Sequence, residues 1–370
     1  MDPSYGYAFP AISGVQAQRE YYISMCPLRL IPRIFLFDEE ELVPELRAQR
    51  TLNKARLPEL SQYIVGNPKD YVFSSITASI DGEVKFDSLG KAGDAKRIGV
   101  LRVPMSARFV INDGQHRRAA IELALRENPE LGDETISVVF FMDVGLKRCQ
   151  QMFADLNRNA IRPSKSLGVL YDHRDDLAQI VRSVTIGVPL FKDLVEMERS
   201  TLSLRSRRLF TLSALYGATR SLLSNLTLPS KEESTKVARE FWEEVVEQFP
   251  EWGRVQSGKL AAGDIRVDFI HSHGIALHAL GRAGNALLHE GGAWRKRLKL
   301  LRKMDWSRSN AALWEGRAMV AGRVCKSGNN LTLTTNVIKK QLGLELTPDE
   351  VRVEEAFKRG EHGDKNWQAA

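Results

Sequence analysis

The hydrophobic pattern changes its period near residue 165, and this change constrains the fold more than any other feature of the 370-residue chain. Before residue 165, short apolar runs typical of strands alternate with stretches of helical spacing, and beyond it the spacing is mostly helical. Strands that alternate with helices form a covered sheet, whereas a helical segment packs helix on helix. The sequence therefore predicts an α+β protein with a small mixed α/β head in 1–165, a mostly helical basic domain in 166–358 and a polar tail in 359–370.

Four runs in the head have the composition of strands: Tyr71–Ile80, Glu83–Phe86, Arg108–Asn112 and Thr135–Asp143. The first two flank Asp81-Gly82, a dipeptide that favours a tight hairpin turn, so we expect them to pair. The last run is apolar enough to be central in a sheet. Between the last two runs, helical spacing predicts a helix over Gln115–Arg126 that ends before Asn128-Pro129.

Beyond Ser166 the helical spacing recurs in five long segments: Val169–Val184, Ser203–Leu223, Glu232–Glu247, His271–Leu288 and Trp294–Met304. Near the C-terminus, the apolar run Leu331–Thr335 precedes a short final helix over Asn336–Leu342. Neither internal repeats nor low-complexity tracts interrupt this pattern.

Composition excludes several classes of protein. No apolar run approaches the roughly 20 residues that span a bilayer, and the first ten residues lack the basic and apolar regions of a secretory signal. Cys26, Cys149 and Cys325 are widely spaced and form no CxxC pair, which favours a reducing compartment over a disulfide or zinc framework. We therefore expect a soluble cytoplasmic protein without a membrane partner.

Positive charge is concentrated in two stretches of the chain, whose overall net charge is +7. The stretch Trp294–Lys326 carries many lysines and arginines against only Asp305 and Glu315, and Arg199–Arg220 contains arginines and no acidic residue. Such clusters indicate a polyanionic partner, of which double-stranded DNA is the leading candidate. The alternative for either stretch alone is a solvated helix face.

The candidate DNA-binding residues are the basic residues of these stretches that share a predicted helix: Arg205, Arg207, Arg208, Arg295, Lys296, Arg297, Lys299, Arg302 and Lys303. The first three are expected at the start of a helix, where free N–H groups and guanidinium groups together bind phosphate. The others cover a helix whose apolar stripe consists of Trp294, Leu298 and Leu301.

The segment Phe109–Leu125 predicts a phosphate site. A strand ends at Asn112, Asp113-Gly114 forms a turn, and a helix starts at once with Gln115, His116, Arg117 and Arg118. Free N–H groups at a helix start, together with basic side chains, favour phosphate. Asp113 does not fit that interpretation, because a carboxylate repels phosphate. It is either an N-cap, a ligand of a divalent cation or a group that orients a water. A capped structural helix with an incidental basic turn is the alternative.

The residues Asp113–Arg117 spell DGQHR, and the chain resembles the DGQHR family, whose DndB branch comprises regulators of bacterial DNA phosphorothioation gene clusters. Three further segments resemble the same branch: Met152–Asp175, Arg50–Pro68 and Asn329–Leu344. They occur in the order of that branch and, with the DGQHR motif, extend over most of the chain, so the resemblance is not limited to a five-residue motif.

The resemblance implies a head similar to the ParB and sulfiredoxin fold, in which Gly114, His116, Arg117 and Arg118 contact a nucleotide phosphate and Arg56 lies close by. It also points to the loop Asn157–Ser166, where Asn157 and Lys165 are candidates to close over a nucleotide or to contact DNA. The alternative for that loop is a polar helix end followed by a serine that caps the next helix.

Two functions follow from the resemblance. The first is a DNA-binding transcriptional repressor of a phosphorothioation operon, acting as a homodimer with the other proteins of that system and with NTP (ATP) as effector. The second is a metal-dependent NTP hydrolase, in which Asp113 orients a metal-bound water, His116 moves a proton, and Arg117 and Arg118 stabilise charge. A purely structural subunit of a modification complex is a third interpretation.

Overall fold

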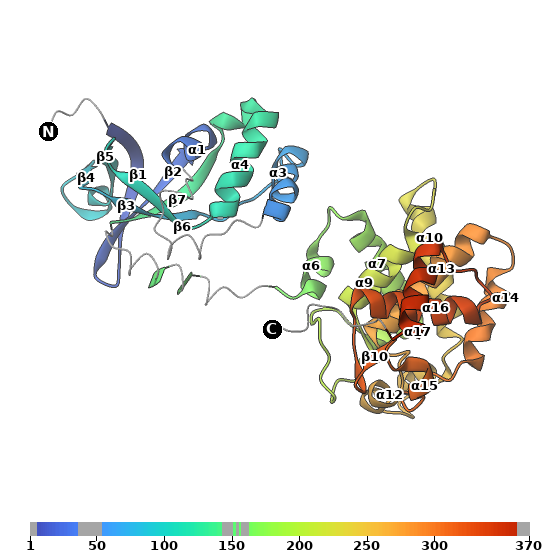
Figure 1. The fold of residues 1–370 in the computed structure, drawn as a ribbon. Helices are drawn as coiled ribbons and strands as arrows, with labels where there is room; N and C mark the ends of the chain where they lie inside the picture. Colours follow the sequence, from blue (N-terminus) through green and yellow to red (C-terminus); the bar gives the residue numbers. More distant parts are fainter. Residues whose placement is uncertain (1–5, 36–53, 143–150, 153–154, 157–162, 361–370) are drawn as a thin grey trace. The chain divides into compact units, whose positions relative to one another are not determined.

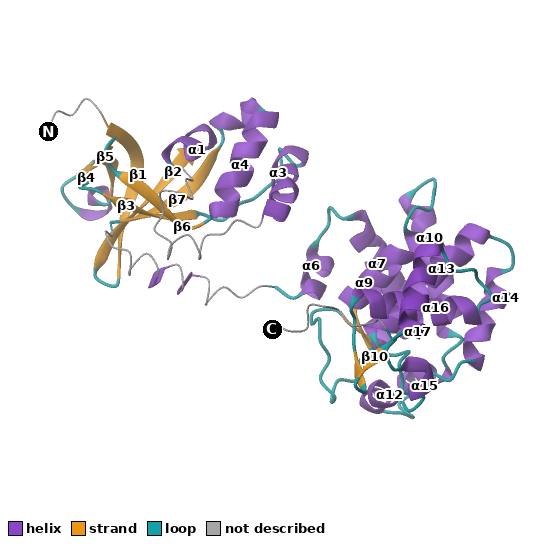
Figure 2. Cartoon of the chain, in the orientation of Figure 1, coloured by secondary structure: helices purple, strands orange, loops and turns teal. Residues whose placement is uncertain are grey.

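The chain contains two compact units, Met1–Ile161 and Arg162–Ala370. The structure, a computed structural model, describes residues 6–35, 54–142, 151–152, 155–156 and 163–360. Strands are concentrated in the first unit and helices in the second (Figures 1 and 2). This arrangement confirms the predicted α+β fold class, with a mixed α/β head followed by a mostly helical part.

Seven strands of the described first unit form one mixed sheet in the order β4-β5-β1-β2-β7-β3-β6. Its strands are β1 (Gly6–Gln16), β2 (Arg19–Pro27), β3 (Ile76–Asp81), β4 (Lys85–Ser88), β5 (Ile98–Pro104), β6 (Arg108–Asp113) and β7 (Thr135–Phe141). Neighbouring strands run antiparallel, except that β3 and β7 run parallel. The predicted strand from Thr135 is therefore central, as its apolar composition indicated.

Helices cover one face of this sheet, and Figure 1 shows α1, α3 and α4 gathered on that side. Their bounds are α1 (Ile31–Ile34), α3 (Leu57–Gly66), preceded by the 3-10 turn η2 (Lys54–Arg56), and α4 (Gln115–Glu127). Alternate strand residues such as Phe9 and Phe140 point into the core, where Ala120 and Ile121 of α4 are fully buried. The helix predicted over Gln115–Arg126 is confirmed, and Asn128 ends it.

The predicted hairpin around Asp81-Gly82 is wrong. Strand β3 pairs with β6 and β7, whereas β4 pairs with β5, at the opposite edge of the sheet. Residues Ile76–Ile80 are all buried, as suits an inner strand with a neighbour on each side, whereas the short and partly exposed β4 suits an edge. The turn dipeptide is present, but long-range packing determines which strands pair.

The second unit is built from helices around one apolar core. Its helices are α6 (Lys165–Tyr171), α7 (Asp176–Gly187), α8 (Pro189–Leu194), α9 (Leu212–Leu223), α10 (Lys231–Val246), α11 (Pro250–Gln256), α12 (Ala262–Asp268), α13 (Gly274–Glu290), α14 (Trp294–Leu298), α15 (Ala311–Trp314), α16 (Gly328–Gln341) and α17 (Pro348–Lys358). Two short ladders pair β8 (Val195–Glu196) with β9 (Phe210–Thr211) and β10 (Met319–Val320) with β11 (Arg323–Val324).

Helices α9 and α13 form the centre of this core and run parallel at very short range. A Cβ placed on Gly281 of α13 would lie 2.1 Å from the carbonyl oxygen of Ala218 on α9. One turn further along both helices, a Cβ on Gly284 would lie 2.8 Å from Leu222. Glycine is therefore required at these positions for the two backbones to approach each other.

Several predicted boundaries in the helical part are wrong. The last helix of the described residues is α17 and not the predicted Asn336–Leu342, and the segment Trp294–Met304 continues beyond α14 as a 3-10 helix. The segment from Val169 is two helices, because the Asp175 side chain caps α7 by accepting from Leu177 N. The segment from Ser203 becomes helical only at Leu212, after the cap formed by Thr211. The run Leu331–Thr335 is not a separate element but lies inside α16, where Thr334 and Thr335 donate to carbonyl oxygens one turn earlier.

Candidate functional site

The turn formed by Asp113–Arg117, here called the DGQHR turn, joins the end of β6 to the start of α4. Gly114 adopts φ +111°, a conformation that L side chains rarely adopt, and a Cβ there would lie 3.1 Å from Ile76. The N-cap residue Gly114 has no side chain to accept from the first turn of α4, and this first helical turn contains no acidic residue. The positive end of the helix dipole here therefore favours an anion.

Arg117 folds back over this turn. Its guanidinium donates to Asp113 Oδ2 at 2.5 Å and to the hydroxyl of Ser74, and its side chain is 19% exposed. The Nε of Arg117 is buried, and no acceptor among the described residues receives its proton. The guanidinium is thus held at the turn, and its Nε–H group is still able to donate a hydrogen bond.

The pKa of His116 is lowered from its ordinary value. Burial lowers the pKa of His116 below 6.5, the cations of Arg56 and Arg117 lower it further, and Asp113 opposes them. Arg56, which ends the 3-10 turn before α3, is therefore close enough to act on the imidazole. The resemblance implied this proximity of Arg56 to the motif, and α3 packs on α4.

The structure gives Arg118 and Gln115 different surroundings from those predicted for phosphate contacts. Arg118 is 8% exposed, and it donates to the carbonyl oxygens of Phe35 and Pro32 and to Glu122. Gln115 is also buried and donates to Ile111 O at 3.3 Å. Both side chains join α4 to neighbouring backbone, so we assign them structural roles and leave them out of the proposed site.

Asn112 is a polar residue of this region that the sequence reasoning missed. It is fully buried, and its Nδ2 donates to Ser79 Oγ at 2.7 Å and to Met152 Sδ at 3.1 Å. Its Oδ1 has no donor among the described residues. An amide in an otherwise apolar strand, next to the motif, was the available signal.

Asp113 is the residue predicted to hold a metal. Among the described residues, no group of three or more His, Cys, Asp or Glu side chains is arranged to bind one. Magnesium bound to a nucleotide is coordinated largely by phosphate oxygens and water, so it needs as little as one carboxylate from the protein. The Asp113 carboxylate is paired with Arg117, and the described protein groups alone do not form a metal site at this turn.

The comparisons with known proteins decide the family. The model of the DndB family, described as DNA-sulfur modification-associated, matches residues 9–345. The chain belongs to this family. Neither the curated proteins nor the solved structures contain a match. Family membership associates the protein with DNA phosphorothioation systems.

The remaining DndB-family segments named above lie partly outside the described residues. The residues that lie outside the described part of the chain include Asn157, Cys149 and residues 50–53. Lys165 is exposed at the start of α6, and Ser164 caps that helix by accepting from Leu167 N at 3.1 Å. The serine cap considered as the alternative for this loop is therefore present.

The candidate DNA-binding arginines Arg205 and Arg207 are exposed, but they lie in a loop and not at a helix start. We call Ser203–Arg208 the basic loop. Arg208, at its end, donates to the carbonyl oxygen of Asp193. The loop lacks helical structure because its carbonyl oxygens are bound by a buried arginine, Arg266.

The other basic stretch loses much of its charge to local contacts. Arg295 pairs with Glu240, and Arg297 pairs with Glu290 and donates to the last carbonyl oxygens near α16. The lysines of this stretch are exposed: Lys296, Lys299 and Lys303. Excess charge counted along the sequence therefore overstates the charge available to a polyanion here.

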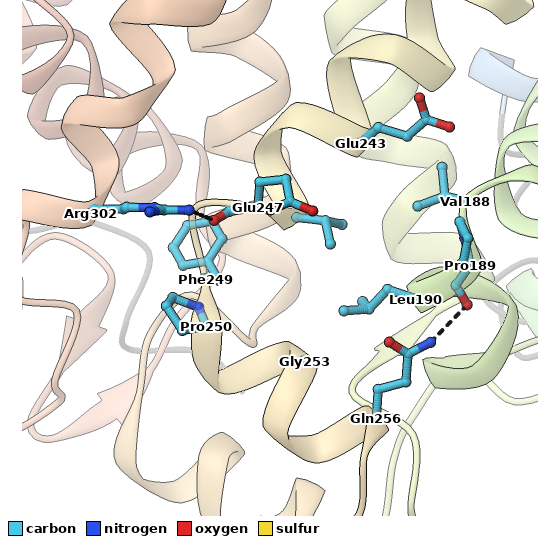
Figure 3. A pocket seen from close by; sticks show the side chains of 11 residues that line it. Val188, Pro189, Leu190, Glu243, Glu247, Phe249, Pro250, Gly253, Gln256 and Arg302 are labelled. Carbon is cyan, nitrogen blue, oxygen red and sulfur yellow. Dashed lines mark hydrogen bonds between the residues drawn. The ribbon is translucent and has the colours of Figure 1, made fainter.

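Arg302 lies at a pocket of about 370 Å³ between α8, α10 and α11. Figure 3 shows its guanidinium donating to the carbonyl oxygen of Glu247, across from apolar side chains such as Leu190. The side chains of Glu243 and Glu247 line the same pocket. These carboxylates disfavour a phosphate next to Arg302.

Two further observations bear on chemistry elsewhere in the chain. No helix of the described residues is long and apolar enough to cross a membrane. His271 accepts from Trp252 Nε1 at 2.9 Å, and His273 Nε2 lies 2.7 Å from Arg266 O, so both imidazoles are engaged in local contacts.

Proposed function

We propose that this DndB-family protein is a cytoplasmic DNA-binding regulator that represses a DNA phosphorothioation operon, acts as a homodimer and holds a nucleotide phosphate at the DGQHR turn. The observation that carries the proposal is the family match over residues 9–345, whose description concerns DNA sulfur modification. A regulator of such a system must recognise duplex DNA, and the exposed cations of the helical unit supply the electrostatic part of that recognition.

The DGQHR turn supports the nucleotide part of the proposal. The positive dipole end of α4, the guanidinium of Arg117 and the nearby Arg56 supply positive charge at one place. Gly114 permits the positive φ with which β6 turns directly into α4. A bound phosphate competes with Asp113 for Arg117, and this exchange gives the turn two states that an effector can bias.

The direct test is binding of the purified protein to two duplexes of equal length. One carries the upstream region of its own phosphorothioation operon, and the other carries the same bases in shuffled order. A sequence-specific regulator binds the first about 10³-fold more tightly or better at moderate salt. Equal affinity for both duplexes would contradict operator-specific repression.

NTP hydrolysis is the second candidate function. The observation that favours it is the presence of a carboxylate and an imidazole, Asp113 and His116, in one turn beside Arg117. Burial keeps the pKa of His116 below its ordinary value, so the imidazole is neutral at pH 7 and able to accept a proton.

Asp113→Asn separates the two candidates. If the turn only binds phosphate, this change releases Arg117 and increases the affinity for ATP measured in EDTA. If the turn hydrolyses ATP with magnesium, the change abolishes phosphate release. Phosphate release by the wild type that persists in Asp113→Asn would contradict the hydrolase assignment.

A further inference from the structure

The basic loop (Ser203–Arg208) is organised around one buried guanidinium. Arg266 of α12 is 8% exposed, and its nitrogens donate to the carbonyl oxygens of Ser203, at 2.6 Å, and of Leu204, at 3.2 Å. They also donate to the carbonyl oxygens of Ser206, at 3.3 Å, and of Arg208. One side chain therefore fixes four peptide groups of a six-residue loop.

The backbone of α12 approaches the same loop closely. A Cβ on Gly263 would lie 2.4 Å from the carbonyl oxygen of Leu204, so only glycine permits this contact. Arg266 and Gly263 lie on the same short helix, which therefore forms the base of the loop. The carbonyl oxygens of the loop are directed at this base.

This arrangement turns three amide N–H groups of the loop away from Arg266, whereas the N–H groups of Ser206 and Arg208 are bonded within the loop. In a planar trans peptide the N–H points away from the preceding carbonyl oxygen. The carbonyl oxygens of Ser203, Leu204 and Ser206 point at Arg266, so the N–H groups of the residues that follow them point away from it. Those residues are Leu204, Arg205 and Arg207. No acceptor among the described residues receives their N–H protons.

The side chains on the outer face add positive charge. Arg205 and Arg207 are exposed, and Leu204 is 71% exposed between Ser203 and Arg205. Arg208 lies partly buried against Asp193. Outward amide groups, two exposed guanidiniums and a buried cation behind them form an anion-binding surface built from irregular backbone.

We propose that the basic loop is a preassembled seat for the backbone phosphates of duplex DNA, with Arg266 as its positioning residue. The inference rests on the proposed DNA-binding function and locates one contact of it. Phosphates recur along a DNA strand, so the two exposed arginines, which are two residues apart on a fixed loop, are suited to contact separate phosphates. Because Arg266 fixes the loop before binding, little conformational entropy is lost when DNA arrives.

The test is the salt dependence of DNA binding by the full chain, measured by fluorescence anisotropy from 50 to 200 mM salt. Each phosphate contact contributes about 0.9 to the slope of log K against log salt. We expect Arg205→Ala with Arg207→Ala to lower the slope by about 1 to 2. Arg352→Ala is the matched control, because Arg352 pairs with Asp349 on α17 and belongs to neither basic stretch, so its slope should equal that of the wild type.

Arg266→Lys tests the positioning role, because lysine keeps the charge but not the fork of donors that binds several carbonyl oxygens. We expect this variant to remain folded by circular dichroism and to show the reduced slope of the double variant. A wild-type slope in Arg266→Lys would overturn the positioning role, and a wild-type slope in the double variant would overturn the seat. Absence of DNA binding by the wild type would instead contradict the proposed function.

Discussion

Replacing Gly114 by alanine should destabilise the first unit and leave the helical unit unchanged. At φ +111° an alanine is strained by about 1–3 kcal/mol, because its Cβ meets the fully buried Ile76 at 3.1 Å and Arg117 at 3.2 Å. Ile76 lies in the core and has little room to move, so overpacking adds about 1 kcal/mol to this cost. We therefore expect the free energy of unfolding to fall by about 2–4 kcal/mol.

Urea unfolding followed by two probes measures this change. All six tryptophans, from Trp242 to Trp367, belong to the second unit, so tryptophan fluorescence reports on the helical unit alone. Far-ultraviolet circular dichroism reports on both units. With an m-value of about 2 kcal/mol/M, the midpoint of the first unit should fall by roughly 1–2 M while the fluorescence midpoint stays in place.

Gly66→Ala is the control within the same unit. A Cβ on Gly66 would lie 3.5 Å from the flexible end of Gln62, and this residue closes a helix. The substitution should therefore change stability by no more than about 1 kcal/mol. Equal midpoints for Gly114→Ala and the wild type, or a shift in the fluorescence transition, would refute the conformational argument.

Two predictions concern pH. The affinity of the DGQHR turn for pyrophosphate should increase only below pH 6.5, because burial and two neighbouring arginines hold the pKa of His116 below that value. Measuring this affinity from pH 5 to 8 tests the prediction. The increase at low pH should be absent in His116→Asn. The second prediction concerns Glu354. Burial raises the pKa of this carboxyl group, but hydrogen bonds from two cations and from Asn336 outweigh burial and lower the pKa from 4.5 to about 2. The stability contributed by ionised Glu354 is thus complete above pH 4.5 and lost towards pH 2. Fluorescence-detected unfolding should therefore show a larger loss of stability over this pH range in the wild type than in Glu354→Gln.

The sequence was informative where local periodicity and packing agree. The strand Arg108–Asp113, the turn at Gly114 and the helix from Gln115 were predicted nearly at their observed bounds, because a buried strand, a glycine and an amphipathic helix each have a local signal. The predicted association of Arg56 with this motif came from family resemblance, since no spacing rule joins residues so far apart.

The sequence was misleading where one distant side chain decides the outcome. Helical spacing continues through Ser203–Arg208, yet Arg266 binds the carbonyl oxygens that a helix would use for itself. Arg118 carries the charge expected of a phosphate contact, but the carbonyl oxygen of Phe35 receives its Nε proton. Residue type and spacing cannot distinguish an arginine that binds a ligand from one that binds backbone, because both need the same donors.

Hydrogen exchange of the full chain, with and without the operon duplex, tests the central claim most directly. The amides of Leu204, Arg205 and Arg207 face outward without acceptors on the described chain, so they should exchange rapidly in the free protein. We predict that the duplex slows exchange in the basic loop and leaves α10, whose surface carries many glutamates, unchanged. Unchanged exchange in the basic loop at saturating duplex would contradict the claim that this loop binds DNA.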